Sequence, residues 1–106
     1  MKNNTGYTLA SGDIVVPDPD DPFAVIVPQK YADLNPLAVV SMGSDNSRVY
    51  VLLTGRWPVN TAVGGLPSER LVTAGAGSLQ ATVAGPGVDS RAVIGRLHTE
   101  GNCLIP

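Results

Sequence analysis

The fold class is decided in the second half of the chain by residues 70–83, which read RLVTAGAGSLQATV. Two apolar runs, residues 70–73 and 79–83, flank a short segment of alanine, glycine and serine. In the second run apolar and polar residues alternate, which is the two-residue period of a strand with one buried face. The stretch therefore predicts a β-hairpin in a fold built from antiparallel strands.

Short apolar runs on both sides of this hairpin extend the pattern. Residues 48–54, RVYVLLT, are almost continuously apolar, so we expect them to form the central strand of a sheet. Residues 92–97 are expected to close that sheet, and residues 100–106 to form a tail. Earlier runs, each ended by proline or by turn residues, lie at 14–16, 23–27 and 37–41.

The composition agrees with an all-β domain. Glycine supplies 12 and proline 9 of the 106 residues, which excludes long helices because both residues interrupt them. About seven or eight short strands, roughly ten residues apart, predict a small β-barrel or sandwich. We expect one such domain over residues 13–106.

The first twelve residues differ in character, because they are polar and small apart from Tyr7 and Leu9. We expect residues 1–12 to form an extended N-terminal arm. Such a segment buries too little apolar surface to offset its ordering entropy, so it should order only against a partner. Tyr7 and Leu9 are two residues apart and would enter the same face of that partner.

Charge and hydropathy narrow the classes of partner. Seven Lys and Arg against nine Asp and Glu give a formal net charge of −2, and no basic cluster is available to neutralise a phosphate backbone. The sequence therefore predicts no nucleic-acid partner. Glycines, a proline and polar residues interrupt the longest uncharged stretch, 71–88, which predicts no membrane partner. The polar N-terminus also lacks the apolar core of a signal peptide.

Few residues are suited to holding a metal. His98 and Cys103 are the single histidine and cysteine of the chain, without further ligands beside them. Cys103 is expected to be an incidental thiol, either buried or in a frayed C-terminal end. Asp18, Asp20 and Asp21 carry oxygen ligands of the kind that binds Ca²⁺, but this loop lacks the bidentate Glu and the Gly of a calcium loop. A solvated surface turn is the favoured interpretation, and we expect no metal and no cofactor.

Two enzymatic interpretations compete with a non-enzymatic one. A serine hydrolase uses a Gly-x-Ser-x-Gly elbow, which is absent, although a triad can also assemble from distant residues. Residues 87–91, GVDSR, resemble the nucleoside-binding motif of trimeric dUTPase-like proteins. Arg91 and Ala92 stand where that motif continues through an aromatic residue, and no phosphate-binding segment matches. We therefore expect no catalytic residues, with a dUTPase-like enzyme as a less favoured alternative.

Two pairs of basic and aromatic residues predict binding to protein, because such residues are enriched at interfaces. Arg48 precedes Tyr50 by two positions, and Arg56 precedes Trp57 directly. An alternative is that Trp57 caps the core and donates its indole N–H to a loop carbonyl. The predicted partner-binding residues are Tyr7, Leu9, Tyr50, Arg56 and Trp57.

Between Val49 and Gly101 an apolar strand is followed by the motifs TGRWPV (54–59), LVT (71–73) and VIGRL (93–97). This order resembles the small β-barrel domains of tailed-phage virion proteins, particularly the capsid cement or decoration family. The resemblance covers about half of the chain. It departs at residues 68–70, where SER replaces the Gly-Asp that usually precedes the Leu-Val strand.

The resemblance implies a homotrimer on the outer capsid surface of a virion, bound to the major capsid protein, with the arm adding strands to it. Similar segments occur in tail-fibre and tailspike domains, so a tail or fibre module is an alternative. Independently, a small domain with few charges has surplus apolar surface for subunits to bury. A monomeric carbohydrate- or ligand-binding β module is the remaining alternative, and it would need an exposed aromatic platform.

Overall fold

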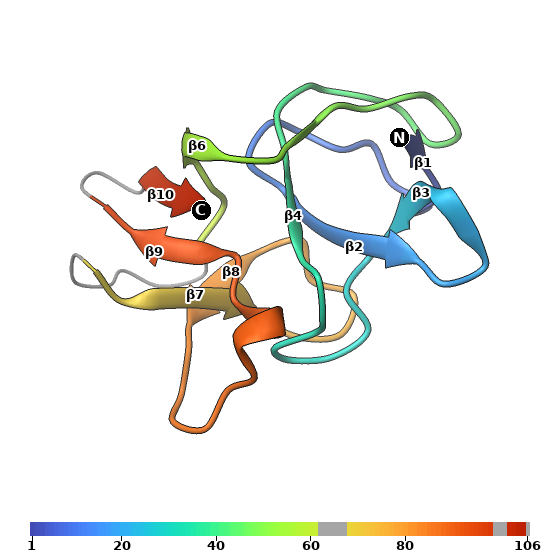
Figure 1. The fold of residues 1–106 in the computed structure, drawn as a ribbon. Coiled ribbons are helices and arrows are strands. Elements are labelled where there is room, and N and C mark those ends of the chain that lie inside the picture. Colours follow the sequence, from blue (N-terminus) through green and yellow to red (C-terminus); the bar gives the residue numbers. More distant parts are fainter. Residues whose placement is uncertain (62–67, 99–101, 106) are drawn as a thin grey trace.

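Two five-stranded sheets make up the computed structural model, which describes residues 1–61, 68–98 and 102–105 (Figure 1). The first sheet has the order β1-β3-β2-β4-β5 and contains β1 (Lys2–Asn3), β2 (Ile14–Asp18), β3 (Asp21–Ile26), β4 (Leu37–Val39) and β5 (Val51–Leu52). The second has the order β6-β10-β9-β7-β8 and contains β6 (Gly55–Pro58), β7 (Arg70–Thr73), β8 (Ala81–Val83), β9 (Gly95–Leu97) and β10 (Asn102–Ile105).

The all-β prediction is confirmed. Within the described ranges the helical structure is a single 3-10 turn, η1 (Ser90–Ala92), whose N-cap Asp89 accepts a hydrogen bond from the Arg91 N–H. That part of the chain has no helix long and apolar enough to cross a membrane. The hairpin predicted from residues 70–83 is also correct, since β7 and β8 pair antiparallel with Leu71 opposite Val83 and Thr73 opposite Ala81.

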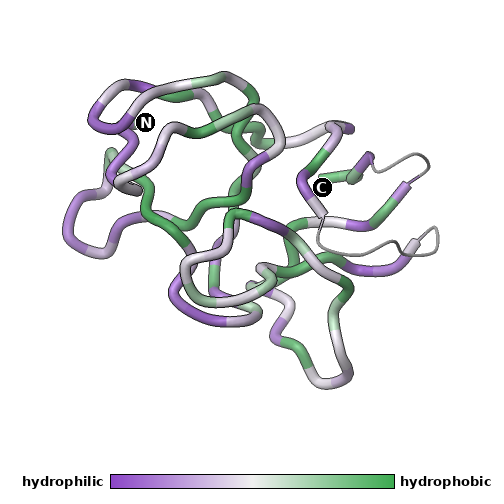
Figure 2. The backbone as a smooth tube through the Cα atoms, turned by 180° about the vertical axis from the view of Figure 1, so that it is seen from behind, coloured by the Kyte–Doolittle hydropathy of each residue, from purple (hydrophilic) through white to green (hydrophobic). Residues whose placement is uncertain are grey.

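The first sheet curls until its two ends are joined by residues 46–50. On one side the Val49 N–H donates to the Met1 carbonyl at 2.7 Å, and the Asn3 N–H donates to Ser47 at 2.7 Å. On the other side the Val40 N–H donates to the Tyr50 carbonyl at 2.9 Å. These bonds complete a ring of backbone, which is visible from behind in Figure 2.

Two hydrophobic cores lie on opposite sides of β2 and β4. Val15 and Val39 belong to the core of the first sheet, together with Leu9, Val25 and Val49. Ile14 and Ala38 belong to the core of the second sheet, together with Val59, Leu71, Ala81, Ile94, Leu97 and Cys103. Because side chains alternate along a strand, β2 and β4 form the wall between the two cores. Ile14 and Val15 of β2, and Ala38 and Val39 of β4, are therefore buried on both faces of the first sheet.

Three sequence predictions are wrong. Residues 48–54 do not form a central strand, because β5 lies at the end of its sheet, Val49 is buried, and Tyr50 and Leu53 are 66% and 79% exposed. Residues 92–97 do not close the sheet, since β9 lies between β10 and β7. The predicted tail contains β10, which pairs with both β6 and β9.

The N-terminal segment is not a separate arm. β1 pairs parallel with β3, and both Asn3 and Leu9 are completely buried. The Asn3 amide donates to the carbonyls of Tyr7, Gly43 and Ser44, and its oxygen accepts from the N–H and hydroxyl of Thr5. These bonds compensate for the low apolar content on which the prediction of an arm relied.

Candidate functional site

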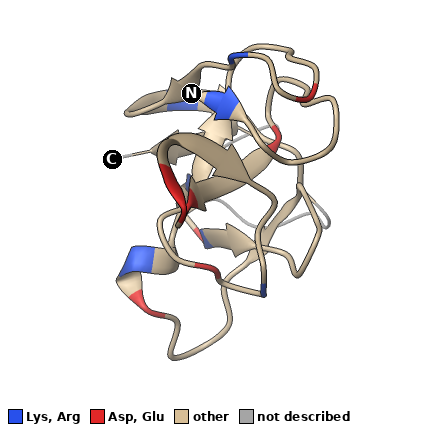
Figure 3. Cartoon of the chain, turned by 90° about the vertical axis from the view of Figure 1, so that its right-hand side faces the viewer, with Lys and Arg blue, Asp and Glu red and all other residues tan. Residues whose placement is uncertain are grey.

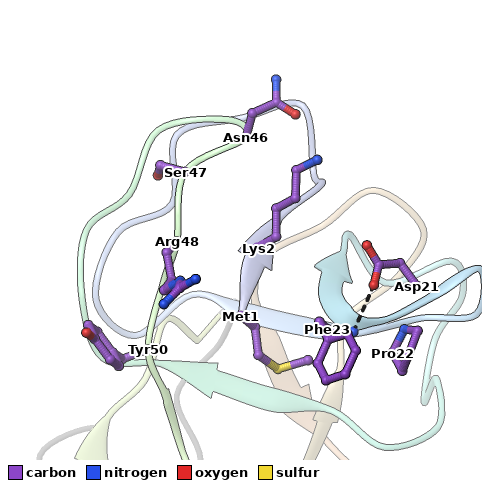
Figure 4. A pocket seen from close by; sticks show the side chains of 9 residues that line it. All are labelled: Met1, Lys2, Asp21, Pro22, Phe23, Asn46, Ser47, Arg48 and Tyr50. Carbon is purple, nitrogen blue, oxygen red and sulfur yellow. Dashed lines mark hydrogen bonds between the residues drawn. The ribbon is translucent and has the colours of Figure 1, made fainter.

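An open hollow with a volume of about 980 Å³ lies where the ring of the first sheet closes. Three segments supply its walls: the start of β1, the start of β3 and the closing segment 46–50 (Figure 4). The lining residues are Met1, Lys2, Asp21, Pro22, Phe23, Asn46, Ser47, Arg48 and Tyr50. We call this the ring hollow.

Two aromatic side chains of the ring hollow face solvent. Phe23 is 78% exposed and Tyr50 is 66% exposed, although large apolar groups are normally covered. In Figure 4 they lie on opposite sides of the hollow, and the Met1 side chain points toward Phe23. The Phe23 N–H donates to the Asp21 carboxylate at 2.9 Å, and the Tyr50 N–H donates to the Ser41 hydroxyl at 3.0 Å. Hydrogen-bonded backbone therefore presents both rings.

Opposite charges line different walls of the ring hollow. Lys2 and Arg48 are partners in an antiparallel bridge, which places two exposed cations on adjacent backbone. The turn from β2 to β3 carries the acidic residues, and Figure 3 shows red on the ribbon below the N-terminus. Among the described residues the one ion pair joins Asp89 and Arg91, 2.8 Å apart. Neither wall of the hollow is therefore neutralised within the described chain.

The acidic turn is held by its own hydrogen bonds. Asp18 accepts the Asp20 N–H at 2.9 Å and the Asn4 side-chain amide at 3.2 Å. Asp21 accepts the Phe23 N–H. Within the described ranges no group of three His, Cys, Asp or Glu side chains converges to hold a metal ion.

The predicted partner-binding residues are not brought together. Tyr50 lies in the ring hollow, whereas Tyr7 is 58% exposed beside a shallower hollow that also includes Asp13, Asn60 and Gln80. Leu9 is completely buried in the first core, so the prediction that it enters a partner beside Tyr7 is wrong. The segment bends at residues 5–7, with Gly6 at φ +82°, so Tyr7 lies in the bend and Leu9 lies beyond it.

Arg56 belongs to a second exposed surface, on β6 and β10. It is opposite Leu104 in the antiparallel pair, so both side chains leave the same face of the sheet. Leu104 is 45% exposed, and Leu53, just before β6, is 79% exposed. We call Leu53, Arg56 and Leu104 the β6–β10 surface.

Trp57 leaves the other face of β6, the one that faces the Cys103 side chain of β10. It lies opposite Cys103, which is completely buried, and is itself half-buried. Its indole N–H donates to the Ser11 hydroxyl at 3.1 Å, where a loop carbonyl was expected. The indole therefore connects β6 to the N-terminal segment.

The Cys103 thiol is buried in the second core, as one of the two sequence expectations held. Burial raises its pKa to about 11. A thiol that stays protonated at neutral pH is a weak nucleophile. The cysteine therefore serves as a small apolar core residue.

Phe23, Lys2 and Met1 were not predicted from the sequence as members of a site. Phe23 was assigned to an apolar run, and only its position directly after Pro22 at a proline-rich turn indicated exposure. Lys2 meets Arg48 through a pairing 46 positions apart in sequence, which no local pattern indicates. No family model, curated protein or solved structure matches the chain. The functional argument therefore depends on the ring hollow and the β6–β10 surface.

Proposed function

We propose that this chain is a structural protein of a tailed-phage virion, which binds the outer surface of the capsid as a homotrimer and stabilises the shell. Its partner is then the major capsid protein. The observation that carries the proposal is the set of large apolar side chains exposed at two places on a hydrogen-bonded all-β domain. Such surfaces are typical of proteins that bind other proteins.

Two separate surfaces suit this role, because a trimer on a shell makes two kinds of contact. One kind joins the copies to each other, and the other joins each copy to the capsid. The ring hollow supplies Phe23 and Tyr50, and the β6–β10 surface supplies Leu53 and Leu104. We assign the β6–β10 surface to the capsid. The resemblance of residues 49–101 to decoration proteins includes β6 and supports the same role.

Binding without catalysis fits the described chemistry. Burial raises the pKa of the Cys103 thiol. The carboxylates of Asp18 and Asp21 accept hydrogen bonds from backbone N–H groups of their own turn. We propose that the chain acts without metal, cofactor or chemical reaction, and that it stabilises the shell through contacts alone.

The proposal is tested by sedimenting phage heads that lack this protein after adding the purified chain. The chain should pellet with heads and saturate at a fixed ratio to coat protein. Replacing Leu53 and Leu104 together by Ser should reduce binding about tenfold or more. Met42→Ser is the matched control, because Met42 is 76% exposed but lies outside both surfaces. Binding to isolated tails but not to heads would contradict a capsid role and favour a tail module.

A ligand-binding module is a second candidate, favoured by the two exposed rings beside an open hollow. Aromatic faces bind sugar rings by apolar contact, with polar groups fixing orientation. Titration calorimetry with soluble oligosaccharides tests this candidate. Heat of binding that Phe23→Ala abolishes, together with no binding to heads, would favour it over the capsid role.

A further inference from the structure

We infer that the ring hollow is the contact between copies of this chain, in which the acidic turn of one copy, Asp18 to Phe23, lies against Lys2, Arg48 and Tyr50 of the next. This inference rests on the proposed homotrimer and assigns its interface. It differs from the sequence prediction, which relied on residues 49–59, because the structure places only Tyr50 of that range in the hollow.

Charge complementarity is the first reason. The turn carries Asp18, Asp20 and Asp21 within four positions, and none of them forms an ion pair with a described residue. Lys2 and Arg48 form the opposite wall and likewise lack an ion pair with any described residue. Like charges side by side are unfavourable on both walls. Placing the acidic wall of one copy against the basic wall of another relieves both repulsions together.

The apolar groups are the second reason. Phe23 follows the acidic residues directly and is 78% exposed, while Tyr50 stands beside Arg48 and is 66% exposed. A contact that joins the charged walls therefore also covers one aromatic ring with the other. The turn is suited to binding because Pro17, Pro19 and Pro22 restrict its backbone before contact, which lowers the entropy lost on association.

The arrangement also explains how the assembly closes. The two walls differ, so the contact joins unlike surfaces, and such contacts produce a ring when the rotation closes. Every copy then uses its acidic wall once and its basic wall once, and no such surface stays exposed in the closed trimer.

Charge reversal tests the contact in the full chain. Arg48→Glu and Asp20→Arg each place like charges across the interface, and the double variant restores opposite charges with the walls exchanged. Neither side chain donates or accepts a hydrogen bond that holds the described fold, and thermal unfolding of each variant checks this. Lys30→Glu is the control, since it makes the same charge change as Arg48→Glu at an exposed loop residue. The measurement is the mass in solution by light scattering over a concentration series at low salt.

The wild-type chain and Lys30→Glu should be trimers, and each single reversal should raise the concentration for half-dissociation about tenfold or more. The double variant should return to within about threefold of wild type. A wild-type monomer at every concentration, or a double variant no better than the single ones, would overturn the inference. If Arg48→Glu leaves the trimer intact but abolishes binding to heads, the ring hollow binds the shell and the proposed contact between copies is wrong. If the single reversals weaken the trimer and the double variant restores it, but the wild-type chain does not bind heads, only the proposed function is contradicted.

Discussion

The backbone N–H of Val49 donates to the carbonyl of Met1 at 2.7 Å, which joins the first residue of the chain to a core position. The N-terminal ammonium donates in return to the Val49 carbonyl at 2.6 Å. This pairing completes the ring of the first sheet and places Lys2 beside Arg48. The fold and the ring hollow therefore depend on the same N-terminal residues.

Asn3→Ala should destabilise the domain by about 3 kcal/mol or more, because the change removes every hydrogen bond of a buried amide and leaves the Thr5 N–H without its acceptor. The Asn3 side chain is completely buried and bonds to carbonyls on both sides of the ring closure. Asn4→Ala is the matched control, since Asn4 is half-buried and its side chain bonds only to Asp18 among the described residues. Chemical denaturation measures both. Equal midpoints for the two variants would show that the N-terminal segment is not part of the fold.

Gly95→Ala should disrupt the pairing of β9 with β10. A Cβ at Gly95 would overlap the Leu104 carbonyl and come within 2.9 Å of the Cys103 sulfur. Neither neighbour can move without breaking the sheet, so we expect the free energy of unfolding to fall by about 3 kcal/mol. Gly75→Ala is the control, because a Cβ there meets nothing within 4 Å. A thermal midpoint for Gly95→Ala within a degree of the control would refute this close approach.

Trp57→Ala should lower the stability of the single copy by about 2 kcal/mol, less than the loss at a fully buried site. The reason is its half-buried position opposite Cys103 and its bond to Ser11. Ser11→Ala should cost about 1 kcal/mol, since only the hydrogen bond is removed. Unfolding is followed by tryptophan fluorescence for Ser11→Ala and by circular dichroism for both. A Trp57→Ala protein with unchanged stability but weakened trimers would restore the interface-anchor interpretation.

The Cys103 thiol should react slowly with a disulfide reagent at pH 8 in the native state and rapidly after unfolding. Burial raises its pKa from 9.0 to about 11, so the folded chain holds the proton more tightly than the unfolded chain. The resulting stability is fully present below pH 9 and is lost as the pH rises toward 11. Reaction in native buffer at the unfolded rate would contradict a buried thiol. Cys103→Ala should remove the part of the stability loss between pH 9 and 11 that the thiol causes.

The parts of the fold that the sequence predicts are local. The β7–β8 hairpin follows from alternation within a short stretch and from the glycines between its strands. β2 was seen as a short run but not as a wall between two cores, because Ile14, Val15 and Val16 are too few to show a period. β10 escaped prediction because Asn102–Ile105 alternates over only four residues.

The candidate site was predicted only in part, because its walls meet through long-range pairing. Tyr50 was identified from its basic and aromatic neighbourhood, and it does line the hollow. Leu9 was misassigned because the segment bends at residues 5–7 before reaching it, and Asn3 provides polar compensation that composition does not reveal. Phe23 escaped because an apolar run is normally buried, whereas the proline-rich turn places its first residue outside.

The thermal stability of phage heads tests the central claim most directly. Heads lacking this protein are heated with a DNA-binding dye, alone and with a saturating amount of the wild-type chain, and the temperature of DNA release is recorded. Ovalbumin at the same concentration controls for non-specific protection. The account predicts that the chain, bound as a trimer, raises the release temperature by several degrees and that replacing Leu53 and Leu104 by Ser removes the gain. Saturated heads that release DNA at the same temperature as bare heads would contradict a stabilising role.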